Sequence, residues 1–127
     1  MQLAHAALWT KDLDAASTFW EEYFNANVGE TYFSKRRVGF ESRFVTWPDS
    51  QLQIELMKGP WLEDKHQQDT FGWDHIAITL GNKAAVEEMA LRCEKDGLLL
   101  SAPRMTGDGF YEAVIAMPDG TPIEIVE

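Results

Sequence analysis

Two stretches decide the fold of this 127-residue chain: LAHAALWT at residues 3–10 and WDHIAITL at residues 73–80. They are copies of one pattern, and a shift of 70 residues places His5 opposite His75. Later motifs repeat in the same order: Gly39-Phe40 with Gly109-Phe110, Pro48-Asp49 with Pro118-Asp119 and, at a shift of 69, Ile54-Glu55 with Ile123-Glu124. Motifs repeated in one order at near-constant spacing predict two copies of one structural unit.

Each copy has the same predicted secondary structure, beginning with a strand of alternating character over residues 2–9 and 73–80. A helix follows in each copy, with Asp12 and Asn82 as the expected N-caps and Gly97 as the expected stop of the second helix. Three strand-like runs complete each copy, with a Pro-Asp turn before the last one. The predicted fold class is therefore α+β, built from two tandem βαβββ modules.

The chain is too short for two ordinary independent domains, so we expect a single domain over residues 1–127. Module one is expected over residues 1–57 and module two over residues 73–127. The polar segment 58–72, which contains Pro60, is expected to be the linker between them. His66 lies in this linker and is expected to be a solvated loop residue.

Charge and composition exclude several classes of partner. The net charge of −10 argues against nucleic acid or an anionic membrane surface, because both are attracted to clustered Lys and Arg. The chain shows neither a signal peptide nor an apolar stretch long enough to span a membrane. Its single cysteine, Cys93, forbids an internal disulfide and is expected to be a small core residue. We therefore expect a soluble, cytoplasmic protein.

Strand periodicity assigns two histidines and two glutamates to the sheet faces opposite the aliphatic side chains. His5 and His75 alternate with aliphatic residues in their strands, and Glu55 and Glu124 are each flanked by Ile or Leu. The aliphatic sides suit cover by the helices, which leaves the four polar side chains on the opposite surface. A buried carboxylate there needs a cation or hydrogen-bond partners. One divalent metal ion would satisfy all four; the alternative is four hydrogen-bonded or half-exposed residues.

Four stretches, LAHAALWT, IELM, GWDHIAITL and PDGTPIEIVE, resemble the ligand strands of glyoxalase I, or lactoylglutathione lyase. That enzyme is a member of the vicinal oxygen chelate superfamily of glyoxalases, bleomycin-resistance proteins and extradiol dioxygenases. The resemblance spans nearly the whole chain and implies paired βαβββ modules that form a cupped mixed sheet around a metal, in a homodimer. It implies that the metal ligands are His5, Glu55, His75 and Glu124, with ligands that can come from both chains of a dimer.

The implied activity is that of a metal-dependent lyase or isomerase acting on a hemithioacetal or another small oxo substrate. Two imidazoles and two carboxylates suit Ni, Zn, Co, Mn or Fe. By the resemblance, the metal polarises the substrate oxygens and stabilises an enediolate, while Glu124 removes and returns the proton and Glu55 assists.

The chain departs from the family at two positions that matter for the substrate. In bacterial glyoxalase I, an Arg four residues after the first-strand His and an Asn four residues after the central Glu help to hold glutathione; here these positions are Trp9 and Gly59. The substrate is therefore left open. Weaker candidates for substrate binding, each with surface or strand exposure as the alternative, are Trp9, Arg37, Arg43, Arg104, Tyr111 and Glu112.

Two other functions stay open. An acyl-CoA epimerase or a dioxygenase would use a related ligand set, although dioxygenases use two His and one carboxylate, so that the additional Glu55 counts against them. A metal-free protein of the bleomycin-resistance type would sequester an aromatic or cationic ligand without chemistry. Its stacking surfaces would come from Trp9, Trp73, Phe40 and Phe110.

Overall fold

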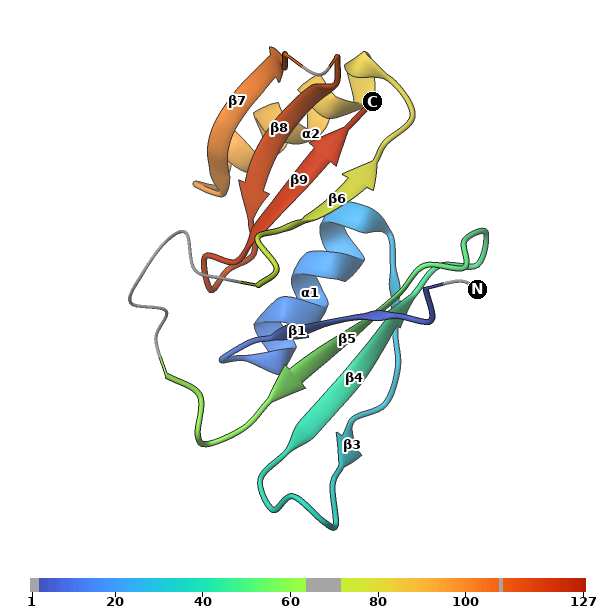
Figure 1. Cartoon of the computed structure of the whole chain (residues 1–127), viewed down its shortest axis with the longest axis vertical. Helices are drawn as coiled ribbons and strands as arrows, with labels where there is room; N and C mark the ends of the chain where they lie inside the picture. The colour runs from blue at the N-terminus through green and yellow to red at the C-terminus, as the bar shows by residue number, and fades with distance from the viewer. Residues whose placement is uncertain (1–2, 64–71, 108) are drawn as a thin grey trace. The chain divides into compact units, whose positions relative to one another are not determined.

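The computed structural model describes residues 3–63, 72–107 and 109–127, in two units, Met1–Lys65 and His66–Glu127 (Figure 1). Each unit is a mixed sheet with one helix packed on one of its faces. The predicted α+β class and the repeat of one unit are thereby confirmed. His66 and the middle of the predicted linker, residues 64–71, lie outside the described residues.

The first unit contains β1 (Ala6–Trp9), α1 (Leu13–Phe24), β2 (Asn27–Val28), β3 (Tyr32–Phe33), β4 (Glu41–Thr46) and β5 (Gln53–Lys58). Its strand order is β1-β5-β4-β2, with β3 also paired to β4. The first and last strands of the unit are parallel neighbours, whereas β4 and β5 form an antiparallel hairpin. The first and last strands of the unit therefore lie side by side at one edge of its sheet, with β1 as the edge strand.

The second unit repeats this topology with β6 (Ile76–Thr79), α2 (Lys83–Lys95), β7 (Leu99–Met105), β8 (Tyr111–Ala116) and β9 (Pro122–Val126). The order is β6-β9-β8-β7, and β6 is parallel to β9. In Figure 1 the two units appear as the blue-to-green and the yellow-to-red halves of the chain. The repeat seen in the sequence is thus a repeat of strand order and direction.

The first unit differs from the prediction in one respect: four strands follow its helix, not three. β2 and β3 both pair with β4, through Val28 opposite Val45 and Tyr32 opposite Ser42. Between them the chain leaves the ladder after Gly29, whose amide still donates to the Phe44 carbonyl at 2.9 Å. The two short strands together occupy the place that β7 has in the second unit. The predicted strands at residues 2–9 and 73–80 are also shorter, because pairing begins only at Ala6 and Ile76.

Both helices begin as their sequences predict, and the second helix also ends at its predicted stop. The Asp12 carboxylate accepts hydrogen bonds from the Asp14 and Ala15 amides at 2.9 and 3.0 Å, and the Ala15 bond lowers the pKa of Asp12. Asn82 caps α2 through the Ala85 amide at 3.0 Å. At its other end Gly97 has φ +72°, and the Leu98 amide donates to the Cys93 carbonyl at 2.7 Å, which is a Schellman motif.

The core of each unit lies between its helix and its sheet. In the first unit, Leu13, Ala16, Phe19 and Trp20 of α1 are buried against Val45, Ile54 and Leu56. The second unit buries Val86, Ala90 and Cys93 of α2 against Ala113, Ile115, Ile123 and Ile125. Cys93 is a fully buried core residue, as predicted, and desolvation raises its pKa to about 11. No helix among the described residues is long and apolar enough to cross a membrane.

Candidate metal site

His5 and Glu55 form a pair on the helix-free face of the first unit. Glu55 lies in β5 between Ile54 and Leu56, whose complete burial beneath α1 turns the carboxylate to the other face. His5 immediately precedes β1, the parallel neighbour of β5, and its Nε2 lies 3.6 Å from Glu55 Oε2. The first and last strands of the unit thus bring together two residues that are far apart in sequence.

The second unit forms the same pair from its own first and last strands. Glu124 lies in β9 between the fully buried Ile123 and Ile125, and its Oε2 lies 3.3 Å from His75 Nε2. The ladder registers also match, because Ala77 is opposite Glu124 as Ala7 is opposite Glu55. In both units the side chains are exposed to nearly equal extents: 40% and 37% for the histidines, 18% and 17% for the glutamates.

The prediction that the four side chains avoid the helix-covered faces is therefore confirmed for each unit. Neither unit gathers a third ligand, since the described residues contain no group of three or more His, Cys, Asp or Glu side chains able to hold a metal ion. Each unit by itself supplies one imidazole and one carboxylate. How the pairs are used together stays a prediction.

The separation within each pair suits two ligands of one metal ion. With bond lengths of about 2.1 Å and a ligand–metal–ligand angle of about 90–120°, the two donor atoms lie about 3.0–3.6 Å apart. The observed distances of 3.6 and 3.3 Å fall within that range, and both involve Nε2 of the ring. Nitrogen and oxygen donors are those that Zn, Ni, Co, Mn and Fe accept, so the residues present fit such an ion.

Asp74 contacts a candidate ligand, His75, and was not singled out from the sequence. Its Oδ2 lies 2.7 Å from Nδ1 of His75, on the side of the ring away from Glu124. A carboxylate there fixes the ring orientation and holds a proton on Nδ1, so that Nε2 is the nitrogen available to a ligand. The sequence contained a signal for this contact, because Asp74 directly precedes the candidate ligand His75. In the first unit Ala4 precedes His5, and the edge of the His5 ring meets Phe44 at 5.5 Å between centroids.

Glu112 and Arg104 lie together in the second unit. Glu112 and Val114 are two residues apart in β8 and therefore point to the same face. Val114 is directly opposite Glu124, so Glu112 shares the Glu124 face of the sheet. Its side chain is largely buried and pairs with Arg104 at 3.4 Å. This ion pair gives the Glu112 carboxylate a cationic partner on the neighbouring strand β7.

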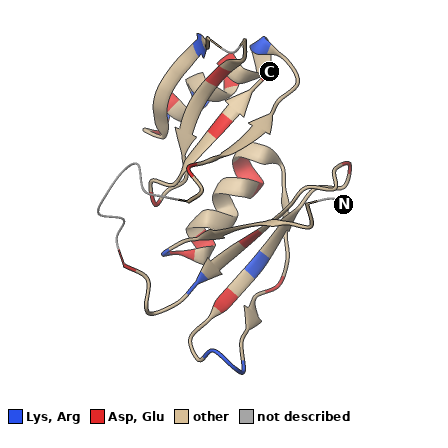
Figure 2. Cartoon of the chain, in the orientation of Figure 1, with Lys and Arg blue, Asp and Glu red and all other residues tan. Residues whose placement is uncertain are grey.

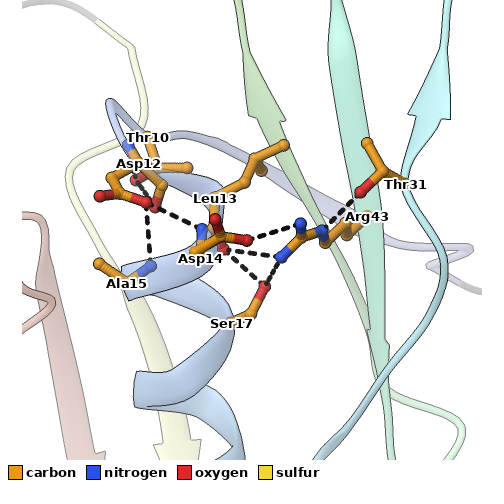
Figure 3. Close-up of polar contacts among 8 residues, drawn as sticks. All are labelled: Thr10, Asp12, Leu13, Asp14, Ala15, Ser17, Thr31 and Arg43. Carbon is orange, nitrogen blue, oxygen red and sulfur yellow. Dashed lines mark hydrogen bonds and ion pairs between the residues drawn. The ribbon is translucent and has the colours of Figure 1, made fainter.

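Arg43, a weak candidate for substrate binding, lies away from His5 and Glu55. Its register places it opposite Leu56, on the helix-covered face. The guanidinium contacts Asp14 at 2.7 Å, Ser17 at 2.9 Å and Thr31 at 2.8 Å, so that it ties β4 to α1 (Figure 3). These contacts occupy most of its donors, and the structure does not bring Arg43 to the His5–Glu55 pair.

Tyr111 likewise lies on the helix-covered face of its sheet. Its hydroxyl donates to Glu87 of α2 at 2.9 Å, and this hydrogen bond to a carboxylate raises the pKa of Tyr111. Lys83 of the same helix lies over the ring at 4.4 Å from its centroid. The structure therefore joins Tyr111 to α2 and not to the His75–Glu124 pair.

Trp9 and Arg37 meet in a cluster on the first unit. The Arg37 guanidinium lies 3.9 Å from the centroid of the Trp61 ring, 5.5 Å from that of Trp9 and 6.0 Å from that of Phe40. We call these four residues the Arg37 cluster. Trp9 is two residues after Ala7 and four after His5, so it points to the same face as they do. The cluster therefore begins on the face that carries His5 and Glu55. Trp61, within the predicted linker, was not singled out from the sequence.

Comparison with known proteins identifies a matching family model and solved structures with the same fold. Residues 2–125 match the family model described as Glyoxalase/Bleomycin resistance protein/Dioxygenase superfamily. The chain is 31% identical over 107 residues to the uncharacterized protein PA2024 of Pseudomonas aeruginosa, an alignment that covers 80% of this chain and 70% of that protein.

Two solved structures have the same fold. A glyoxalase family protein from Enterococcus faecalis superimposes with a TM-score of 0.81 at 16% identity, over 99% of this chain and 97% of that one. Lactoylglutathione lyase from Agrobacterium tumefaciens superimposes with a TM-score of 0.71 at 20% identity, over 99% and 92% of the two chains.

Proposed function

The chain belongs to the glyoxalase/bleomycin resistance protein/dioxygenase superfamily, and we propose that within it this protein is a metal-dependent lyase or isomerase of the glyoxalase I type. Its substrate is a hemithioacetal or another small oxo compound, converted through an enediolate. The proposal includes His5, Glu55, His75 and Glu124 as one ligand set for a divalent ion, completed within one chain or across a homodimer.

One observation carries the proposal: each unit presents an imidazole Nε2 and a carboxylate Oε2 at 3.6 or 3.3 Å, from equivalent strand positions. A histidine or glutamate at a single site is most simply a half-exposed polar residue. The same pair, with the same atoms and nearly the same exposure in both units, is better explained by a shared chemical role. The spacing supports that role because it suits two ligands of one ion.

A divalent ion bound by these residues would supply Lewis-acid stabilisation of the negative charge on the substrate oxygens. The chain's own groups supply the proton transfer. In the proposal, the Glu124 carboxylate removes a proton from the carbon next to the carbonyl and returns it to the neighbouring carbon, while Glu55 assists. Both carboxylates are mostly buried, which limits exchange of the proton with water during the transfer.

Asp74 has a supporting role in this proposal. It holds the proton on Nδ1 of His75 and leaves the lone pair of Nε2 directed to the Glu124 side. Glutathione is not assumed as the thiol, because Trp9 and Gly59 replace the side chains that hold it in the bacterial enzyme. The Gly59 site is instead filled by the Trp61 ring, which a Cβ at Gly59 would meet.

Elemental analysis of the purified protein tests the ligand set before any substrate is chosen. We expect near-stoichiometric Ni, Zn, Co, Mn or Fe in the wild-type protein and strong loss of metal in His75→Ala and Glu124→Ala. Glu88→Ala, an exposed position on α2, is the matched control and should retain the metal. Equal metal content in all four proteins would show that the ligand set is wrong.

Turnover is then measured on a panel of hemithioacetals and 2-oxo thioesters with protein loaded with Ni or Zn. We expect isomerisation of at least one member, lost in Glu124→Ala. A full metal site without turnover of any member would exclude the lyase or isomerase activity. Ligand binding that persists unchanged in chelator, in a protein that contains no metal, would instead favour the sequestering function.

A further inference from the structure

In the Arg37 cluster, a guanidinium lies among three aromatic rings. Arg37 lies within cation–π distance of Trp61, Trp9 and Phe40. The rings also contact one another edge to face: Trp9 and Phe40 at 6.1 Å, Trp9 and Trp61 at 6.4 Å between centroids. Such contacts hold the guanidinium in place without using its N–H donors in hydrogen bonds to carboxylates.

Arg37 forms no ion pair and no side-chain hydrogen bond with any residue that the structure describes. Arg43 and Arg104, by contrast, pair with Asp14 and Glu112. Arg37 is therefore positioned by aromatic rings and has no carboxylate partner among the described side chains. Its forked set of N–H donors stays available to bind a carboxylate or phosphate with two hydrogen bonds.

Two glycines allow the cluster to form. A Cβ at the buried Gly59 would clash with the Trp61 ring, and a Cβ at Gly39 would lie 2.8 Å from Pro60 Cδ. The loop between β3 and β4 is therefore able to contact the segment after β5. Its backbone is closed by hydrogen bonds, with the Ser34 amide donating to the Phe40 carbonyl at 3.0 Å and the Phe40 amide to the Arg37 carbonyl at 2.9 Å.

The local charge also favours an anion. Lys35, Arg36 and Arg37 follow one another in a chain whose net charge is −10, and Figure 2 shows them as the blue loop between β3 and β4. Local positive potential raises the concentration of anions near the loop despite the overall acidic balance. A basic loop alone would be a solvated surface; the rings are what hold one of its three cations in place.

The position of the cluster relates it to the His5–Glu55 pair. Glu55 lies opposite Ala7, and Trp9 is the next residue along β1 on the same face. Same-face neighbours along a strand are about 7 Å apart, which places Trp9 about 7 Å beyond the Glu55 position and about 13 Å beyond His5. A small molecule can therefore contact the carboxylate at one end and the Arg37 cluster at the other.

We infer that the Arg37 cluster is a specificity site that binds an anionic group, carboxylate or phosphate, at the end of the substrate remote from the reacting carbon. Trp61 and Trp9 pack against the planar or apolar part of the molecule next to that anion. The assignment of the other end as the reacting end rests on the proposed function. The anion site itself rests only on contacts within the first unit.

Calorimetric titration tests this assignment with three probes that share an acetylphenyl group. Two are anionic, 4-acetylbenzoate and 4-acetylphenyl phosphate, and one is neutral, methyl 4-acetylbenzoate. We expect the wild-type protein to bind at least one anionic probe about 10- to 100-fold more tightly than the ester, the range for charge-assisted hydrogen bonds. The two anionic arms distinguish a carboxylate from a phosphate as the preferred group.

Three variants assign the preference to the cluster. Arg37→Met should lose most of the preference for anionic over neutral probes. Gly59→Ala should weaken this preference by displacing Trp61, without removing any charge. Arg36→Met removes the neighbouring positive charge and is the matched control that should keep the preference. Circular dichroism checks that each variant is folded. Equal wild-type affinity for anionic and neutral probes, no measurable anion binding, or a full preference in Arg37→Met would overturn the assignment.

Repeating the titrations in chelator separates this inference from the proposed function. We expect the anion preference to persist without metal, because the cluster contains no metal ligand. A preference that disappears with the metal would mean that the metal, not Arg37, binds the anion, and would overturn the inference. A preference that depends on Arg37 in a protein shown to contain no metal would support the inference while refuting the metal-dependent activity.

Discussion

Asp74 lies 2.7 Å from Nδ1 of His75, so the ring is held from the side opposite to Glu124. Because this contact sets the orientation and tautomer of a proposed ligand, Asp74→Asn should weaken metal binding about 10- to 100-fold while leaving the fold intact. Competition with a chromophoric chelator measures the affinity. Asp49→Asn, an exposed position in the first unit, should bind metal as the wild type does; equal weakening in both variants would contradict a specific role for Asp74.

Arg43 is predicted to stabilise the fold and to have no role in substrate binding. Arg43→Met removes contacts to Asp14, Ser17 and Thr31 and should lower the free energy of unfolding by about 1–2 kcal/mol. Asp14 is itself largely exposed, so the ion pair contributes little of this. Urea denaturation measures the change, with Arg36→Met as a control expected within about 0.5 kcal/mol of wild type. A selective rise in KM with unchanged stability would contradict this prediction.

Cys93 gives a defined pH dependence of stability. Burial raises its pKa to about 11 from 9.0, so the native state keeps the thiol proton at pH values where the unfolded chain releases it. The stability that this contributes is fully present below pH 9 and is lost as the pH rises from about 9 to about 11. Urea denaturation at a series of pH values should show a smaller loss over that interval in Cys93→Ala than in wild type. Identical pH profiles would refute the shift. Tyr111 titrates in both proteins, so the comparison removes its contribution.

Gly97 is predicted to be required by backbone conformation alone. It has φ +72° at the end of α2, and a Cβ there would meet no atom within 4 Å. Gly97→Ala should therefore cost about 1 kcal/mol through left-handed strain, with no steric clash. Gly107→Ala is the matched control, because that site is equally open but lacks a positive φ, and it should be nearly neutral. Thermal unfolding of the two variants makes the comparison, and equal melting temperatures would contradict the prediction.

Much of the fold could be predicted because its determinants are local and duplicated. Asp12 and Asn82 cap their helices, and Gly97 ends the second one. The alternation Ile-Glu-Leu and Ile-Glu-Ile assigns Glu55 and Glu124 to the helix-free faces without ambiguity, since their neighbours are completely buried. The pairing of each glutamate with its histidine follows from the parallel contact between first and last strands.

Other features depend on contacts that periodicity does not encode. β4 has polar residues on both faces, so its sequence does not reveal that Arg43 lies beneath α1. Tyr111 begins a strand that is largely buried on both faces, and only the register with β9 assigns its side. The position of Trp61 and the contact between the β3–β4 loop and Pro60 depend on close approaches that Gly59 and Gly39 permit.

The parallel pairing of first and last strands also has a consequence for the order of events during synthesis. The members of each imidazole–carboxylate pair are separated by 50 residues in the first unit and 49 in the second. The ribosome must therefore release nearly a whole unit before its pair can exist, and closing that long loop is among the slower steps in forming a sheet. If these pairs bind metal as proposed, the ion would be captured only after each unit has folded.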